Sequence, residues 1–500
     1  MAFTIENGVL IKYIAEEGVT DVVIPDGIEV IDSIAFRESE ITSVFIPDSV
    51  KEIKSCAFED CRQLVSVRLS EQLEKLGIFS FKNCFKLSKI VIPESVKIIN
   101  INAFEGCESL TDITLPSDIE YCPACAFEDT PWYEKYMQEN DFLIIGHLLV
   151  SWAPKSETVI IPEGITEIDE EHEFPDTIRK IVFPVGVKVI PARLFMECEK
   201  LEEVVLPDGL IEIGPDAFNR CYNLHSINFP EGLKTIEEYA FRNCRSLKEI
   251  ILPDSVTDVG NYAFSDCVSV KKLKLPNNNI GWYDSSFNML PIEHLHIPEK
   301  LTDGEPISMA FSSNQLTEIT VDENNPSLTS YEGVLYSKDM TVLYKAPDKI
   351  ERITIPDTVT KIMKFAFACC KKLREVVIPE SVKEIGPRAF VLCKGLESID
   401  LPQGLTSIGT AAFAECTSLK RIVIPSNLDE IGVNAFTCCE NLCEVSMPEL
   451  IPNLQYEFTK HELTDYYSEK TESTEQLAKD VFSGTPWLKG QGYADDEEEE

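Results

Sequence analysis

The residues of this sequence best able to do chemistry are its 17 cysteines and 6 histidines. Thiolates and imidazoles bind metals, and thiolates also attack electrophiles and exchange disulfides. The segment Cys122-Pro-Ala-Cys125 has the spacing of a redox dithiol or of half a zinc site. No second pair of this spacing completes a zinc site, and the sequence carries no serine-hydrolase, phosphate-loop or zinc-protease motif. We therefore expect no catalytic, metal-binding or cofactor-binding residues, and a protein that is not an enzyme.

The spacing of most cysteines indicates a structural role. Because cysteine is small, apolar and a weak S–H donor, it suits a buried turn beside backbone carbonyls. We expect a core ladder without disulfides, since neighbouring side chains would point in parallel. So many unpaired thiols favour a reducing compartment. Cys122 aligns with the position held elsewhere by Ile53 or Ile385 and is expected to be buried. Eleven cysteines lie three residues after a phenylalanine: Cys61, Cys84, Cys107, Cys198, Cys221, Cys244, Cys267, Cys370, Cys393, Cys416 and Cys439.

The elements that carry this ladder come from a 23-residue repeat. Proline recurs at this interval from Pro207 to Pro276 and from Pro356 to Pro448. Each unit has the pattern P-x-x-V-x-x-I-x-x-x-A-F-x-x-C-x-x-L-x-x-I-x-I, and about fifteen units, some degenerate, account for most of residues 25–448. The closing L-x-x-I-x-I predicts a short strand, proline ends it, and V-x-x-I predicts a second extended segment. One turn cannot bury its own apolar residues, so the fold class is a β-rich repeat solenoid.

The series I-P-x-x-V-x-x-I-G-x-x-A-F-x-x-C-x-x-L, as at 378–396 and 401–419, resembles the BspA-type leucine-rich repeats. This family is common in surface and secreted proteins of gut bacteria and some protists. The resemblance covers about four-fifths of the chain. It implies a leucine-rich-repeat-like, right-handed curved array, a role in adhesion or protein recognition, and no catalytic activity.

Three interruptions and two ends divide the array. Each interruption contains two β-prone runs around a polar turn and is expected to form a hairpin. The segment 481–489 echoes 126–135, which suggests a degenerate last turn that caps the stack. The predicted parts are an N-terminal capping hairpin (1–24), repeats (25–130), a hairpin insertion (131–160), repeats (161–316), a hairpin insertion (317–352), repeats (353–448), a degenerate C-terminal cap (449–493) and a disordered acidic tail (494–500).

Charge and hydropathy restrict the partners and the location. With 45 Lys and Arg against 85 Asp and Glu, the net charge of -40 repels phosphate backbones and anionic membranes. We expect no nucleic acid and no membrane insertion, a protein partner, and a monomer. Since no signal peptide or membrane span is recognisable, the chain as written is expected to be cytoplasmic. The alternative is a secreted or cell-surface protein, if the N-terminus is truncated.

Within this acidic chain, one series of strand positions is basic. The variable positions of L-x-x-I-x-I should face outward, where related repeat proteins bind partners. We hypothesise that this strip contacts an acidic partner, with Trp282 and Tyr283 on the adjacent irregular turn, although by register Trp282 occupies the Ile column of the core. The function predicted is a protein-interaction scaffold; the alternatives are an adhesin that binds host proteins and a structural or decoy antigen without a fixed ligand. The candidate partner-binding residues are His225, Asn228, Lys248, Lys271, Lys272, Lys274, His294 and His296.

Overall fold

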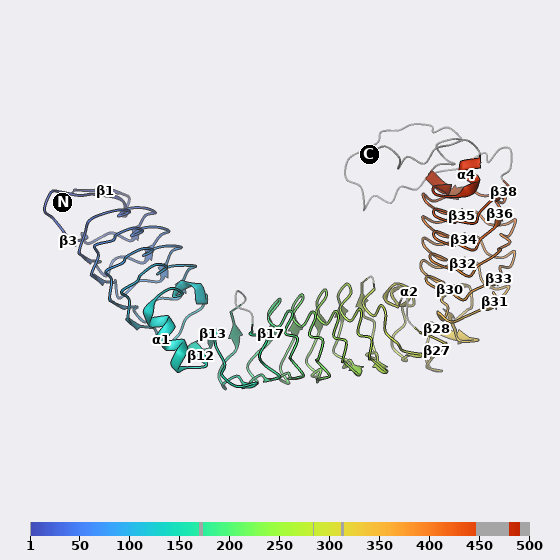
Figure 1. Ribbon diagram of the computed structural model, residues 1–500, viewed down its shortest axis with the longest axis horizontal. Coiled ribbons are helices and arrows are strands. Elements are labelled where there is room, and N and C mark those ends of the chain that lie inside the picture. Colours follow the sequence, from blue (N-terminus) through green and yellow to red (C-terminus); the bar gives the residue numbers. More distant parts are fainter. Residues whose placement is uncertain (1, 170–173, 284, 312–314, 447–479, 491–500) are drawn as a thin grey trace. The chain divides into compact units, whose positions relative to one another are not determined.

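The computed structural model describes residues 2–169, 174–283, 285–311, 315–446 and 480–490. In this part the chain forms a β-solenoid of about 19 turns, spaced about 23 residues apart. The sequence repeat predicted about fifteen. The chain divides into unit 1 (Met1–Phe218) and unit 2 (Asn219–Glu500), and Figure 1 shows the turns stacked within each.

Each regular turn contains two short strands. In one turn of unit 2, Glu375–Val377 (β33) is the strand that the closing motif predicts, and Glu384–Ile385 (β34) follows the proline. The central residue of β33 is buried and its two neighbours are exposed, as strand alternation requires. Both strands pair in parallel with the preceding turn, Arg352 opposite Glu375 and Lys361 opposite Glu384. We call the two series the first strands and the second strands.

Unit 1 contains both series. Its first strands are β3 (Asp21–Val23), β5 (Ser43–Phe45), β7 (Ser66–Arg68), β9 (Lys89–Val91), β11 (Asp112–Thr114), β14 (Thr158–Ile160), β16 (Lys180–Val182) and β18 (Glu203–Val205). Its second strands are β4 (Val30–Ile31), β6 (Glu52–Ile53), β8 (Lys75–Leu76), β10 (Ile98–Ile99), β15 (Glu167–Ile168), β17 (Val189–Ile190) and β19 (Glu212–Ile213).

Unit 2 repeats the arrangement. Its first strands are β20 (Ser226–Ile227), β22 (Glu249–Ile251), β24 (Lys272–Lys274), β26 (His294–Ile297), β27 (Glu318–Val321), β31 (Arg352–Thr354), β33, β36 (Arg421–Val423) and β38 (Glu444–Ser446). Its second strands are β21 (Thr235–Ile236), β23 (Asp258–Val259), β25 (Gly281–Trp282), β32 (Lys361–Ile362), β34, β35 (Ser407–Ile408) and β37 (Glu430–Ile431).

The core is a set of ladders in which like residues stack. In unit 1, the rings of Phe58 and Phe81 are parallel with centroids 5.0 Å apart, and in unit 2 those of Phe390 and Phe413 are also 5.0 Å apart. All four rings are fully buried. Such contacts with the adjacent turns are what one turn cannot make alone.

The predicted cysteine ladder is confirmed. Cys107 Sγ donates a hydrogen bond to the carbonyl oxygen of Phe81 at 3.1 Å, one turn back, and Cys393 donates to that of Phe367 at the same distance. All 17 cysteines are free thiols. At least nine of the eleven ladder thiols donate to a carbonyl oxygen in this way, so the regular spacing of the cysteines has a structural cause.

Three antiparallel hairpins interrupt the regular turns. They are formed by β1 (Ala2–Glu6) with β2 (Val9–Ile14), by β12 (Phe142–Ile145) with β13 (Leu148–Trp152), and by β28 (Leu328–Tyr331), β29 (Val334–Ser337) and β30 (Val342–Lys345). The last strand of each pairs in parallel with the next second strand: β2 with β4, β13 with β15 and β30 with β32. Each hairpin thus supplies the first rung of the ladder that follows it.

Two segments differ from the hairpins predicted from sequence. The first part of 131–160 is a helix, Pro131–Glu139 (α1), because Thr130 caps it and proline occupies its first position. In 317–352, β27 is still a regular first strand paired with β26, and the inserted sheet has three strands. A further helix, Glu305–Ala310 (α2), precedes this region.

The echo between 126–135 and 481–489 corresponds to one repeated local structure. Thr130 and Thr485 take the place of the ladder cysteine, and each Oγ1 donates to the carbonyl of the phenylalanine three residues earlier, at 2.7 and 2.8 Å. A helix then begins, α1 in one case and Pro486–Gly490 (α4) in the other, and its tryptophan packs edge-on against that phenylalanine. This Thr-Pro-Trp cap covers the end of a ladder. Residues 447–479 and the predicted acidic tail (494–500) lie outside the described residues.

Candidate protein-binding surface

The basic strip lies on first strands of unit 2. Lys272 and Lys274 are the two ends of β24, and Lys271 and Lys248 directly precede β24 and β22. Alternation along β24 directs Lys272 and Lys274 outward, while Ile250 of β22 is buried. Lys248 and Lys271 lie just before their strands and are also exposed. All eight predicted residues are exposed.

Backbone pairing brings the four lysines together. β22 and β24 pair in parallel, with Glu249 opposite Lys272. One residue earlier, the amide nitrogen of Lys271 donates to the carbonyl oxygen of Lys248 at 2.8 Å, so these two lysines share a column on adjacent turns. We call Lys248, Lys271, Lys272 and Lys274 the lysine cluster.

The other predicted residues flank the lysine cluster. His225 and Asn228 adjoin β20, on the turn that precedes β22 in sequence. His294 and His296 belong to β26, which pairs with β27 in a sheet separate from that of β22 and β24.

The cations of the strip differ in their partners. Lys272 Nζ lies 3.5 Å from Glu249 Oε2, and His294 Nδ1 lies 3.5 Å from Glu318 Oε2. Lys248, Lys271 and Lys274 make no ion pair with any residue in the described part of the chain. Stacked like charges on adjacent strands are unfavourable. The three unpaired ammonium groups are therefore the members best placed to attract an external carboxylate.

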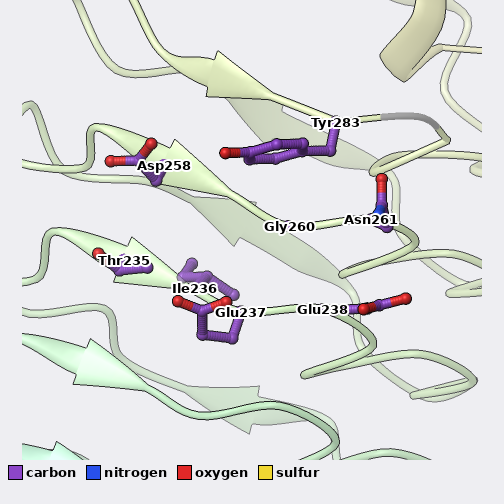
Figure 2. A pocket seen from close by; sticks show the side chains of 8 residues that line it. All are labelled: Thr235, Ile236, Glu237, Glu238, Asp258, Gly260, Asn261 and Tyr283. Atoms are coloured by element: carbon purple, nitrogen blue, oxygen red, sulfur yellow. The ribbon is translucent and has the colours of Figure 1, made fainter. Parts of the chain in front are cut away.

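The aromatic residues expected beside the strip lie elsewhere. The backbone of Trp282 in β25 pairs with that of Val259 in β23, which confirms that Trp282 occupies the isoleucine column. The structure does not describe the Trp282 side chain. The Tyr283 side chain is 52% exposed and lines a cavity on the second strands, not the first (Figure 2). The prediction that aromatic and basic groups form one surface is wrong for Tyr283, because consecutive strands of a turn belong to different sheets.

The cysteine pair singled out by its spacing lacks the character of a redox site. Cys122 is buried, and burial together with the nearby Asp169 carboxylate raises the pKa of its thiol well above the usual value. A reactive cysteine needs the opposite shift, because the thiolate is the nucleophile. No group of three or more metal-ligating side chains occurs within the described residues.

Comparison with known families identifies the class of protein. The family described as BspA type Leucine rich repeat region (6 copies) matches residues 15–134, 74–201, 144–271, 234–332 and 341–464. These matches cover most of the chain, which therefore belongs to the BspA-type leucine-rich repeat family. No curated protein matches the sequence.

Several solved structures are similar. A leucine rich cell surface protein from Faecalibacterium prausnitzii is 25% identical, with 60% of this chain and 90% of that one covered and a TM-score of 0.47. A leucine-rich repeat protein from Bacteroides ovatus is 23% identical (91% and 97% covered, TM-score 0.32). The pneumococcal vaccine antigen PcpA is 19% identical (69% and 96% covered, TM-score 0.46).

None of the helices in the described ranges has the length and apolar character that crossing a bilayer demands.

Proposed function

We propose that this protein is a non-enzymatic interaction scaffold that binds an acidic segment of a partner protein through the lysine cluster on β22 and β24. The observation that carries the proposal is the column of Lys248 and Lys271, which stacks two positive charges without a carboxylate between them.

On several other turns, cations at first-strand positions are paired with a carboxylate of the adjacent turn. Lys89 lies 2.7 Å from Asp112, and Lys420 lies 3.0 Å from Glu397. Such pairs satisfy the charge within the molecule. Unpaired lysines at an exposed strand pair instead offer charge complementarity to a partner, which directs encounter and orientation.

The net charge of -40 strengthens this argument. An acidic ligand is repelled by most of the protein and attracted only where cations lack internal partners. The free thiols further suggest that the scaffold works in a reducing compartment.

The test uses the full-length protein and a fluorescent oligoglutamate peptide, with oligoglutamine as the neutral analogue. The variant Lys271→Glu, Lys272→Glu, Lys274→Glu should bind oligoglutamate at least about tenfold more weakly, since several exposed charge contacts are reversed. Binding by the unmodified protein should also weaken as salt is added.

A matched control changes the same net charge on first strands of the same unit. Arg352→Glu, Lys420→Glu, Arg421→Glu reverses three cations that each lie near a carboxylate, at 3.6, 3.0 and 3.8 Å. This variant should retain most of the binding. Equal losses in the two variants would show that only net charge matters and would overturn the proposed site.

A further inference from the structure

A surface cavity of about 340 Å³ lies on the second strands of unit 2. Three successive turns build it: β21 supplies Thr235 and Ile236, β23 supplies Asp258, and Tyr283 follows β25. It lies on a different sheet from the lysine cluster.

Two glycines, of which Gly260 lines the cavity, mark close approaches between successive turns here. A Cβ added to Gly281 would lie 2.6 Å from Asp258 Oδ1, and one added to Gly260 would lie 2.4 Å from the amide nitrogen of Glu238. Neither position has room for a side chain. Gly260 thus allows the backbone of the adjacent turn to approach closely, and Gly281 leaves the position beside its Cα to the Asp258 carboxylate.

An aromatic ring and carboxylates face this space. Figure 2 shows the ring of Tyr283 extending from the end of β25 toward Asp258, with Glu237 on the other side of Gly260. Glu238 points away from them. One wall is thus an exposed π face, and acidic groups flank it.

The carboxylate at this position differs from those at equivalent positions in its ion pairing. Asp258 is the first residue of its second strand, as Glu52 and Glu384 are of theirs. Glu52 lies 3.3 Å from Lys75, and Glu384 lies 2.7 Å from Lys361, each on an adjacent turn. The residues paired with Asp258 are Thr235 and Gly281, and the described residues place no cation in an ion pair with it.

We propose that the cavity binds a protonated amine or guanidinium group, such as a lysine or arginine side chain presented by a partner protein. The cation takes the place that Lys75 and Lys361 hold at the equivalent rungs. Asp258 provides a charge-assisted hydrogen bond, and the ring of Tyr283 provides a cation–π contact. This site has a negative charge where the lysine cluster has a positive one, and it lies on a different sheet. It is therefore independent of the function proposed above.

The test uses the full-length protein labelled with 3-fluorotyrosine, whose Tyr283 resonance is assigned with Tyr283→Phe. Blocked arginine amide and blocked lysine amide should shift that resonance in fluorine NMR. Blocked glutamine amide, which has similar size and no charge, should not. A comparable shift with glutamine amide or methyl glucoside would overturn the assignment of a cation.

Two variants test the contacts. Tyr283→Ala should weaken the affinity for arginine amide about tenfold, as measured by calorimetry. Asp258→Asn, which keeps the shape, should weaken it about threefold or more. Unchanged affinity in Asp258→Asn, with an unchanged unfolding temperature, would overturn the proposal.

The controls separate this site from others. Tyr331→Ala removes a ring that is similarly exposed (50%) in β28 of the same unit and should leave the affinity unchanged. The lysine-cluster variant should also bind arginine amide normally, so failure of one proposal can be distinguished from failure of the other.

Discussion

The same column of first-strand positions carries opposite charge arrangements in the two units. In unit 1, Arg179 is 3.1 Å from Glu157 on one side and in contact with Glu202 on the other, so charges alternate from turn to turn. In unit 2, Lys248 is followed by Lys271. The backbone beneath both columns is the same parallel ladder.

This difference distinguishes charged side chains that are paired within the fold from charged side chains that are left unpaired. The hydrogen bond that Arg179 donates to Glu202 and the charge of Glu157 raise the pKa of the Arg179 guanidinium, as expected for a cation held by its neighbours. A repeat sequence could place glutamate at 271 as readily as at 202. A column of lysines forms no internal ion pair. An intermolecular contact made by these lysines accounts for that arrangement.

The largest expected effect tests whether the same kind of phenylalanine ladder stabilises each unit. Phe195 of unit 1 and Phe264 of unit 2 are both fully buried and stacked on both sides, with neighbouring centroids 4.8 to 5.4 Å away. Phe195→Ala and Phe264→Ala should each lower the free energy of unfolding by about 3–5 kcal/mol, measured by urea denaturation. A loss below about 1 kcal/mol in either would mean that this ladder does not support the local turns.

A second prediction concerns the thiols beneath both regions. Burial raises the pKa of Cys61 to about 11 and that of Cys267 to about 12. Since the unfolded thiol titrates near 9.0, the unfolded state loses its protons first as the pH rises. The stabilisation from the protonated ladder should be complete below about pH 9 and be lost between about pH 9 and 12.

Thermal unfolding followed as a function of pH measures this loss. Cys267→Ala, which cannot ionise, should show a shallower decline than the unmodified protein. Thiolate absorbance that appears in the folded protein near the ordinary cysteine pKa and is reduced in Cys267→Ala would contradict the buried ladder, because every other cysteine is the same in the two proteins.

The smallest expected effect is the sharpest test of the comparison. Lys271→Glu places a carboxylate next to Lys248 in the column of unit 2, as Glu202 lies next to Arg179 in unit 1. The unfolding temperature should stay the same or rise slightly. Affinity for oligoglutamate should nevertheless fall about fivefold.

Arg179→Glu is the reciprocal change in unit 1. It stacks three carboxylates, so the unfolding temperature should fall slightly while oligoglutamate binding stays unchanged. If Lys271→Glu lowers stability and leaves binding intact, the lysines of unit 2 are ordinary surface charge.

Much of this architecture could be read from the residues themselves. The 23-residue spacing of Pro379 and Pro402, and of Cys393 and Cys416, specifies the turn length and the buried columns, because only stacking buries residues that recur once per turn. The ladder thiols and the register of Trp282 follow from the same alignment. The similarity between segments 126–135 and 481–489 indicated the second Thr-Pro-Trp cap.

Other features needed the folded chain. The helix α1 was missed because its residues are also β-prone, and the cap at Thr130 together with the contact between Trp132 and Phe127 decided the outcome. Strand pairing decided that each hairpin begins a ladder.

By itself, the sequence determined the repeat, the core columns and the exposure of the strip, because these depend on periodicity within the chain. Only the tertiary structure decided which cations remain unpaired, since Lys272 and Lys271 are neighbours in sequence yet only Lys272 meets a carboxylate from the adjacent turn. It also separated Tyr283 from the lysines and placed it beside Asp258. Interactions between turns depend on side-chain positions about 23 residues apart, which a pattern of residue types does not specify.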